Sequence, residues 1–383
     1  MRVCFVSQQI GTVRTGVGTY ANALVPAVAA AGHPATLVGR GADPQWPGVT
    51  YHAVPAAPGD PTPEGWLSFA WLAARRLRRL LAAGGFDVVH FLDAREALFA
   101  PRRGAMVGTV HDCYLATASP ALGYWRRRYG DWARRWAYHR LARRLEQAAL
   151  GRLDRLIANS NYVREALVAA YRLPPRALRT VYLGFSFPWP AAEDGARAGT
   201  RAVLFVGANF ERKGLPALLA ALARVRPRVP DVELHVLGDH PSRRRMEARA
   251  AALGLGGRVT FHGFVPRAEV AACYRSAALL ALPSEVEGFG ITLLEAMHSG
   301  LPVIASAEGG SGELVRDGWN GYLVQPGDVG GLADRLLELL GDERRRAEMG
   351  GNGRRTAERF TLGRMVDETL AVYRDAVAGG SSE

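Results

Sequence analysis

The 383-residue sequence lacks several features that define particular classes of protein. It has no run of roughly 20 apolar residues, the length that a membrane-spanning helix needs. Residues 1–10 are too short and too strand-like for a signal peptide, so we expect the chain to stay in the cytoplasm. The cysteines Cys4, Cys113 and Cys273 are scattered and lack metal-ligand spacing. We therefore expect neither a disulfide framework nor a zinc site, and we predict that all three thiols are small buried residues.

Acidic residues are the minority among the charged residues. The formal net charge is +12 and the pI is near 10.1, which favours an anionic partner such as nucleic acid, phospholipid or a phosphorylated substrate. No recognisable nucleic-acid-binding module accompanies the charge, so nucleic acid is not an expected partner. The charge alone does not choose between the other partners.

Short apolar or β-branched runs alternate with longer helical patterns along most of the chain. This alternation is typical of parallel sheets covered by helices. The first half predicts strands at Arg2–Ser7, Ala35–Gly39, Asp87–Phe91, Met106–His111, Arg155–Asn159 and Leu178–Leu183. The second half predicts strands at Val203–Val206, Glu233–Leu237, Arg258–Phe261, Leu279–Leu282 and Val303–Ser306.

The segment 186–200 separates the two series of strands. It is rich in proline, glycine and small residues and has no apolar period, which is the composition of a linker. We therefore expect an N-terminal Rossmann-like domain at 1–185 and a C-terminal one at 201–360. A last helical pattern and a flexible tail occupy 361–383, and the sequence leaves open whether this helix packs back on the N-terminal domain.

A basic motif, GANFERKG, occupies residues 207–214 between a predicted strand and a predicted helix. The guanidinium of Arg212 can bind two oxygens at once, while Lys213 supplies a point charge. At the carboxyl end of a strand, these cations can offset the charge of a diphosphate without a metal. A solvated basic loop is the alternative interpretation.

A second motif, at residues 283–295, also follows an apolar strand and enters a helix. Gly288 and Gly290 let the backbone approach a ligand closely. The amides of residues 290–292 would point outward at the start of the helix, where anions bind. This position suits phosphate oxygens.

Two carboxylates flank that helix start. Glu287 precedes the helix and Glu295 lies inside it, so they can meet opposite ends of one ligand. A carboxylate chelates vicinal hydroxyls well, and a sugar and a ribose each offer such a pair. The alternatives are a helix cap for Glu287 and a surface acid for Glu295.

Together these motifs resemble the retaining GT-B glycosyltransferases of family four, whose signature is two Glu separated by seven residues. Glu287 and Glu295 have this spacing. Further features of the family occur in order across nearly the whole chain, at Thr15–Tyr20, Gly32-His33, His111-Asp112, Arg212-Lys213-Gly214, Gly263-Phe264, Gly309-Gly310 with Glu313, and Asn320-Gly321. The resemblance implies the GT-B fold, an α/β architecture in which the parallel sheets of two Rossmann-like domains face each other across a cleft.

The resemblance also implies roles for residues of the C-terminal domain. Arg212 and Lys213 would bind the donor diphosphate, Glu295 the ribose hydroxyls and Glu287 the hydroxyls of the transferred sugar. The remaining donor contacts would come from backbone at two places: sugar and phosphate contacts at Phe289, Gly290, Ile291 and Thr292, and nucleobase contacts at Phe264 and Val265.

Two residues of the N-terminal domain complete the implied site. Gly16 would let the chain pass close to the diphosphate, because it has no side chain. His111 ends a predicted strand, where ligands gather in such sheets. By resemblance His111 faces the donor's sugar and phosphate, so we assign it to donor positioning and transition-state contact. The alternatives are a structural role for His111 and an ordinary tight turn at Gly16.

The sequence contains no Asp-x-Asp motif to hold a divalent metal between phosphates. The acids of Glu285-Val286-Glu287 are similarly spaced, but we do not expect them to bind a metal. We therefore expect a metal-independent enzyme without a cofactor. The resemblance implies retention at the anomeric carbon, through an oxocarbenium-like state in which the departing phosphate accepts the acceptor's proton.

The acceptor is the least defined partner. Tyr124–Arg155 interleaves aromatic residues with ten Arg against Asp131, Glu146 and Asp154. Such a helix can lie on the surface of an anionic membrane. Alternatively, its aromatic side chains can pack on the core while its Arg side chains stay exposed to solvent. We favour transfer to a hydroxyl of a small soluble natural product. A lipid-linked or polysaccharide acceptor at the inner membrane face, with peripheral membrane contact through this segment, remains open, as does a nucleotide-sugar epimerase or silent nucleotide-sugar binder.

Overall fold

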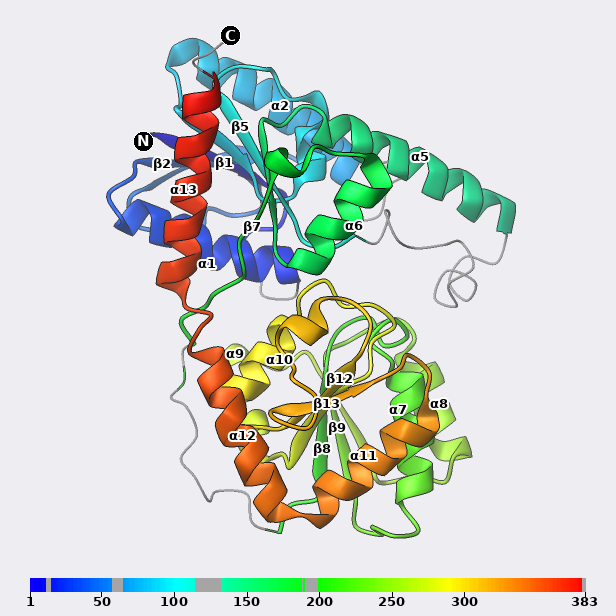
Figure 1. The fold of residues 1–383 in the computed structure, drawn as a ribbon. Helices are drawn as coiled ribbons and strands as arrows, with labels where there is room; N and C mark the ends of the chain where they lie inside the picture. The colour runs from blue at the N-terminus through cyan, green and yellow to red at the C-terminus, as the bar shows by residue number, and fades with distance from the viewer. Residues whose placement is uncertain (12–14, 57–64, 114–131, 188, 190–198, 381–383) are drawn as a thin grey trace. The chain divides into compact units, whose positions relative to one another are not determined.

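The computed structural model describes residues 1–11, 15–56, 65–113, 132–187, 189 and 199–380. The chain forms two compact units (Figure 1). The first unit consists of Met1–Ser186 and Thr361–Glu383, and the second of Phe187–Phe360. The second unit is thus inserted into the first, and the break between them falls at the start of the expected linker 186–200.

The first unit contains a seven-stranded parallel sheet with the order β3-β2-β1-β4-β5-β6-β7. All residues of β1, β4 and β5 are buried, as expected for strands with helices on both faces. The strands are β1 (Val3–Ser7), β2 (Ala35–Arg40), β3 (Val49–Val54), β4 (Val88–Phe91), β5 (Ala105–Val110), β6 (Arg155–Ala158) and β7 (Leu178–Thr180).

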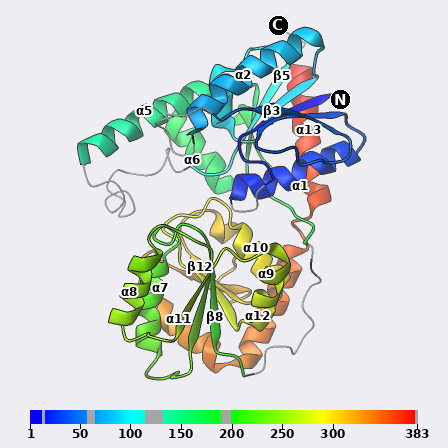
Figure 2. The same ribbon diagram turned by 180° about the vertical axis from the view of Figure 1, so that it is seen from behind.

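Helices α1 (Gly16–Ala30) and α13 (Leu362–Gly380) pack against each other on one face of this sheet, and α2 (Trp66–Ala83) covers the other (Figures 1 and 2). The side chain of Thr15 caps α1 by accepting a hydrogen bond from the amide of Gly18 at 3.1 Å. The other helical elements among the described residues of this unit are η2 (Ala94–Phe99), α5 (Trp132–Leu150), α6 (Asn161–Tyr171) and η3 (Pro175–Ala177).

The C-terminal helix α13 belongs to the first unit, where it packs on β4, β5 and β6. Tyr373 is fully buried, and its hydroxyl lies 2.6 Å from His90 Nδ1. His90 Nε2 lies 2.8 Å from the Oγ1 of Thr109. Burial, aided by nearby His111, lowers the pKa of His90 to about 3, so this imidazole is neutral. The last helix is therefore joined to β4 and β5 of the first sheet by a buried network of hydrogen bonds.

The second unit contains a six-stranded parallel sheet with the order β10-β9-β8-β11-β12-β13. Its strands are β8 (Ala202–Val206), β9 (Glu233–Leu237), β10 (Val259–Gly263), β11 (Leu279–Leu282), β12 (Val303–Ser306) and β13 (Gly321–Val324). Its helical elements are α7 (Leu215–Val225), α8 (Arg243–Ala252), α9 (Arg267–Ser276), α10 (Ile291–His298), η4 (Gly310–Glu313), α11 (Val329–Gly341) and α12 (Glu343–Ala357).

Both sheets use the same doubly wound order. In each, the first strand of the unit lies beside the fourth, β1 beside β4 and β8 beside β11, so the strand order reverses there. Ligands of such sheets bind outside the carboxyl ends of the strands at this reversal. The fold thus confirms two parallel-sheet α/β domains and directs attention to the loops after β8 and β11.

Two strands and one cysteine differ from the sequence predictions. Edge strands β3 and β13 were not predicted, because β3 is mostly half-exposed and lacks an apolar run, and β13 is four residues long and begins with Gly321. Cys4 and Cys113 are buried, but the prediction of a buried residue is wrong for Cys273, which is half-buried on α9 beside exposed Ala272. No helix within the described residues combines the length and the apolar character that crossing a bilayer requires.

Candidate active site

The loops that follow β8 and β11 are bound directly to each other. The amide of Glu285 donates to the carbonyl of Arg212 at 2.7 Å. Gly214, which begins α7 with a φ of +80°, lies so close to the other loop that a Cβ would fall 1.9 Å from the carbonyl oxygen of Pro283. Only glycine tolerates both this φ and this approach. The two motifs predicted from sequence therefore meet at the strand-order reversal.

Lys213 and Glu287 form an ion pair between these loops. The Lys213 Nζ lies 2.5 Å from the Oε2 of Glu287, and the two side chains are only 14% and 10% exposed. Ser284 donates from its Oγ to the same carboxylate oxygen at 3.2 Å. Lys213 is also the only lysine of the sequence, although Lys and Arg together number 48. The one side-chain ammonium of the chain therefore lies in the candidate site.

The protonation states of this pair follow from burial and charge. Burial lowers the pKa of Lys213, and the attraction of Glu287 opposes this effect only in part. Burial would raise the pKa of Glu287, but Lys213 and then Arg212 outweigh it, so the pKa is lowered. Glu287 is thus a carboxylate, which can accept hydrogen bonds from hydroxyls.

Arg212 lies half-buried beside this pair. Its backbone amide donates to the Oδ1 of Asn209 at 3.3 Å, which fixes the turn that carries both cations. One guanidinium nitrogen lies 3.4 Å from the carbonyl oxygen of Val286. The structure therefore brings Arg212, Lys213 and Glu287 together.

The backbone of Glu287 is held by a glycine pair that follows β12. The amide of Gly310 donates to the carbonyl of Glu287 at 2.7 Å. Gly309 has a φ of +94°, and a Cβ there would lie 2.2 Å from that same carbonyl oxygen. Sequence analysis noted Gly309-Gly310 only as a family feature, whereas the structure gives the pair a physical role: it sets the position of Glu287.

The N-terminus of α10 lies directly after Glu287. Gly290 precedes the helix with a φ of +107°, and its carbonyl accepts from the amides of Leu293 and Leu294 at 3.0 and 3.1 Å. For the amides of Ile291 and Thr292, no backbone acceptor exists in the described part of the chain. Such amides at a helix start suit an anion.

Phe289 differs from its neighbours in this segment. Its ring is 2% exposed and packs edge-on against Phe360 with ring centroids 5.7 Å apart. Its side chain is thus part of the core, and only its backbone is available for the predicted ligand contact.

The other predicted donor contacts occupy two more elements of the second unit. Glu295 lies on α10, and its Oε2 accepts from the hydroxyl of Tyr274 at 3.0 Å. Phe264, directly after β10, is 47% exposed, and Val265 next to it is half-exposed. Phe264 thus presents a flat apolar ring at the carboxyl end of a strand.

Gly16 and His111 belong to the first unit. Gly16 is the first residue of α1, and His111 directly follows β5. The Nε2 of His111 lies 2.8 Å from the carbonyl oxygen of Leu92, which requires a proton on Nε2. Burial lowers the pKa of His111, although Asp93 opposes this shift. The imidazole is therefore neutral, and its buried Nδ1, which has no hydrogen-bond partner among the described residues, is an acceptor.

A cavity of about 30 Å³ lies beside His111. Sequence analysis missed most of its charged lining, because the residues come from separate elements and form no motif. Asp93 and Arg95 pair at 2.5 Å. Val17, Ala94, Val110 and Leu150 supply the apolar walls, and Asp93, Arg95, His111, Asp112 and Glu146 the polar ones.

Glu146 is a buried acid of this cavity lining. It is 5% exposed and accepts a hydrogen bond from the hydroxyl of Tyr171. Burial raises its pKa to about 7, against the opposing effect of that hydrogen bond. Glu146 therefore changes charge near neutral pH.

The predicted membrane segment Tyr124–Arg155 is only partly covered by the structure. Residues 124–131, with Trp125, lie outside the described residues. The helix α5 extends over Trp132–Leu150, so a long helix exists in this segment as the sequence suggested. Its aromatic side chains at Trp132 and Trp136 are not among the described ones.

No group of three or more His, Cys, Asp or Glu within the described ranges is arranged to hold a metal ion. Divalent cations take oxygen ligands from carboxylates, carbonyl groups, water and substrate phosphates. Near the second unit's site, the described charges at Arg212 and Lys213 are cationic. They suit the phosphates themselves.

Two family models together match nearly the whole chain. Residues 14–187 match the model described as Glycosyltransferase Family 4, and residues 191–356 the one described as Glycosyl transferases group 1. D-inositol 3-phosphate glycosyltransferase 1 of Catenulispora acidiphila is 30% identical over an aligned length of 357, and the match covers 87% of this chain and 82% of that protein. The GDP-mannose-dependent alpha-(1-6)-phosphatidylinositol monomannoside mannosyltransferase of Mycolicibacterium smegmatis is 30% identical over 80% of this chain and 89% of its own length.

Solved structures resemble the chain over its full length. Sucrose-phosphate synthase from Thermosynechococcus elongatus superposes with a TM-score of 0.83 at 25% identity and covers 99% of each chain. WaaG, a glycosyltransferase involved in lipopolysaccharide biosynthesis, has a TM-score of 0.77 at 20% identity, with 97% of this chain and 99% of WaaG covered. The second similarity bears on the fold alone.

Proposed function

Because this chain belongs to glycosyltransferase family 4, we propose that it transfers a sugar, with retention, from a nucleotide-diphosphate donor to an acceptor hydroxyl. The observation that carries the proposal is the meeting of Arg212, Lys213 and Glu287 at the strand-order reversal of the second sheet. Two cations and one carboxylate suit a diphosphate joined to a sugar. One relative's name includes dependence on GDP-mannose, which is a donor of this class.

The proposed donor pose follows from the chemistry of each group. Arg212, Lys213 and the amides of residues 290–292 bind the diphosphate, because all of them are hydrogen-bond donors. Glu287 accepts from the sugar hydroxyls and Glu295 from the ribose hydroxyls. The nucleobase lies against Phe264 and Val265.

The proposed chemistry needs neither metal nor cofactor. The bond between the anomeric carbon and the diphosphate oxygen breaks, and its electron pair leaves with the phosphate. Arg212, Lys213 and the helix amides stabilise that charge. The acceptor oxygen attacks from the same face, and its proton passes to the departing phosphate. In the first unit, the neutral Nδ1 of His111 can accept a hydrogen bond from a hydroxyl of the donor sugar. Gly16, which has no side chain, lets the backbone approach the diphosphate closely.

We propose a small, soluble, hydroxyl-rich acceptor in the cytoplasm. The support is the set of charged side chains beside His111, because Asp93, Arg95 and Asp112 lie just after the carboxyl ends of β4 and β5. Asp93, Asp112 and Glu146 bring carboxylates, which chelate hydroxyls. Among the relatives, the one from Catenulispora is named for a phosphorylated inositol, which is a small polyol.

The experiment that tests the proposal is a donor and acceptor screen. Purified protein is incubated with UDP-, GDP- and ADP-sugars and with polyols, sugar phosphates and lipid acceptors, and products are detected by mass spectrometry. Proton NMR of the product gives the anomeric configuration. We expect a retained configuration and full activity in excess EDTA. An inverted product would contradict the mechanism, and activity restored only by Mg²⁺ or Mn²⁺ would contradict metal independence.

A second candidate function, transfer to a lipid-linked acceptor at an anionic membrane, is favoured by one surface. On α2, Trp71 is 46% exposed and lies under the guanidinium of Arg75, 4.9 Å from its ring centroid. Arg78 and Arg79 are exposed on the same helix, which contains no acidic residue. An exposed aromatic ring among cations suits an anionic lipid surface.

A further inference from the structure

The segment that leaves the first unit is fixed to the second. Trp189 is 6% exposed although the surrounding residues 186–200 were predicted to be a linker. Its indole N–H donates to Ser299 Oγ at 3.1 Å, and its carbonyl accepts from the Nε2 of His298 at 3.0 Å. Phe187 stacks on the ring of His298 with centroids 4.3 Å apart. Phe187 and Trp189 are therefore held at the carboxyl end of α10 by ring stacking and hydrogen bonds.

The same tryptophan supports a second aromatic ring. Trp189 stacks on Tyr274 of α9, with ring centroids 6.1 Å apart and planes 25° from parallel. Tyr274 is fully buried, and its hydroxyl donates to the Oε2 of Glu295 at 3.0 Å. A contact chain therefore leads from the connecting segment through Tyr274 to the carboxylate of Glu295.

A carboxylate that chelates two vicinal hydroxyls must hold a defined rotation. The terminal torsion of glutamate is soft, so a carboxylate without neighbours samples many orientations. A hydrogen bond from a rigid, fully buried ring removes that freedom before the ligand arrives, which lowers the entropic cost of binding. Tyr274 has the required rigidity because Trp189 packs against its face.

We propose that Tyr274, supported by Trp189, is a positioning residue that orients Glu295 toward the ribose hydroxyls of the nucleotide. Trp189 is then part of the support of the donor site. This inference rests on the ribose role proposed above for Glu295. It gives Trp189 a role in donor binding, in addition to its place in the connection between the two units.

The test measures recognition of the ribose hydroxyls. Calorimetry compares UDP with 2′,3′-dideoxy-UDP, or GDP with its dideoxy form if GDP binds more tightly. Tyr274→Phe keeps the ring and removes the hydroxyl, so we expect the affinity for the ribose form to fall by about 3- to 10-fold. Affinity for the dideoxy form should not change. Trp189→Leu should cause a smaller loss of the same kind, and the KM for the donor should rise while kcat stays near its original value.

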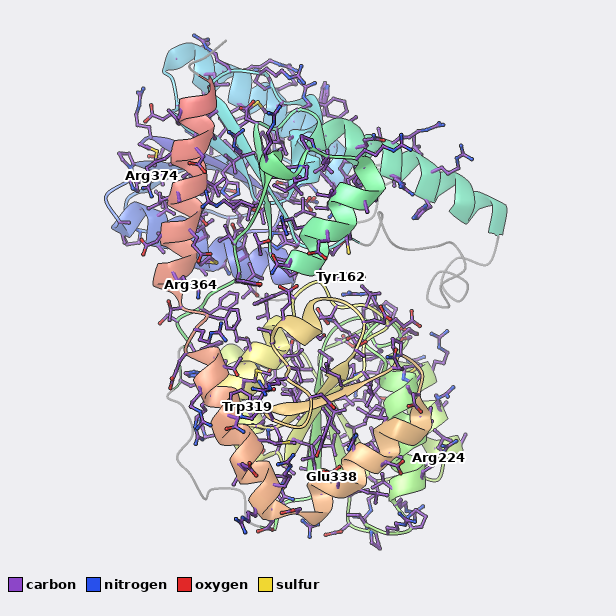
Figure 3. All side chains as sticks on the ribbon, in the orientation of Figure 1. Tyr162, Arg224, Trp319, Glu338, Arg364 and Arg374 are labelled. Atoms are coloured by element: carbon purple, nitrogen blue, oxygen red, sulfur yellow. The ribbon has the colours of Figure 1, made fainter. Side chains whose placement is uncertain are left out.

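A matched control exists in the same unit. Tyr322 donates its hydroxyl to Glu338, which is labelled on α11 in Figure 3. Tyr322→Phe removes an equivalent hydrogen bond away from the donor motifs and should leave both affinities unchanged. If Tyr274→Phe weakens both nucleotides equally, or neither, the positioning role is wrong. If Glu295→Gln retains the full preference for ribose, the ribose assignment itself is wrong.

Discussion

The ammonium of Lys213 lies 2.5 Å from the carboxylate of Glu287, although the two residues follow different strands of the second sheet. Each side chain compensates the charge of the other in a place with little access to water. Removing one partner of such a pair leaves an uncompensated buried charge. Variants at either position therefore affect both diphosphate binding and the protonation of the partner.

Lys213→Arg should not preserve donor binding. The Lys213 side chain is only 14% exposed and its Nζ lies 2.5 Å from the Oε2 of Glu287, so a longer side chain with a broad planar guanidinium has little space. We expect Lys213→Arg and Lys213→Ala to weaken binding of the preferred nucleotide diphosphate by about 10- to 100-fold in calorimetry. Arg228→Lys, at an exposed site on the same unit, is the control. Full affinity in Lys213→Arg would contradict the requirement for a compact ammonium.

The pKa of Lys213 can be measured directly, because selective isotopic labelling of lysine yields one side-chain signal. We expect the pKa to be below the ordinary lysine value, since burial lowers it. Glu287→Gln should lower the pKa further, because the attraction of the carboxylate is lost. Bound nucleotide diphosphate should raise it. An NMR titration that places the pKa at or above the ordinary value would argue against the buried pair.

Gly309→Ala should damage the site through the backbone of Glu287. The added Cβ would overlap the Glu287 carbonyl oxygen at 2.2 Å, and a φ of +94° is strained for alanine. We expect a loss of unfolding free energy of about 2 kcal/mol or more, together with lower activity. Gly312→Ala, where a Cβ would meet nothing within 4 Å, is the matched control in η4. Equal stability of the two variants in denaturant unfolding would refute the contact.

Glu146 predicts a pH-dependent stability of the first unit. Its folded pKa of about 7 exceeds the unfolded value of 4.5, so the folded state holds the proton more tightly. The stability that this proton confers is complete below pH 4.5 and is lost as pH rises to about 7, a difference of about 3 kcal/mol. Glu146→Gln should therefore match the original protein at about pH 4 and exceed it in Tm at about pH 8.

The control for this titration is Glu165→Gln on α6, where the side chain is 74% exposed. This variant should keep the pH dependence of the original protein. If Glu146→Gln lowers the Tm equally at both pH values, the raised pKa of Glu146 is contradicted.

The α2 surface predicts binding to anionic vesicles. Full-length protein should sediment with phosphatidylglycerol-containing vesicles and not with pure phosphatidylcholine, and salt should weaken this binding. Arg75→Gln with Arg79→Gln, or Trp71→Ser, should reduce it. Arg228→Gln with Arg244→Gln removes the same charge from exposed sites of the second unit and should have little effect. Binding to neutral and anionic vesicles alike would contradict the electrostatic basis, and absence of binding would leave the soluble acceptor as the supported function.

Sequence patterns predicted the sheets well where burial is continuous. The strands at Glu233–Leu237, Leu279–Leu282 and Val303–Ser306 match their predicted bounds. The last two are buried throughout, and the first has three buried apolar residues in five. The edge strand at Val49–Val54 was not predicted, because its mostly half-exposed residues do not form a continuous apolar run. Local sequence indicates local burial, and an edge strand such as β3 is buried only in part.

The candidate site was predictable as a set of residues but not as an arrangement. The motifs indicated Arg212, Lys213 and Glu287, yet nothing in their spacing shows that lysine and glutamate pair directly. Tyr274 and Trp189 carry no motif at all, because their contact with α10 arises from packing between distant segments. The roles of the predicted residues in binding and catalysis remain predictions for the experiments above.

The insertion of Phe187–Phe360 into the first unit has a consequence for biosynthesis. The second unit leaves the ribosome before Thr361–Glu383 does, so the second unit can fold while the first still lacks α13. Until that helix arrives, the face of the first sheet around His90 stays uncovered and its partner Tyr373 is missing. The N-terminal half is thus the last to be completed, which reverses the usual order of folding during translation.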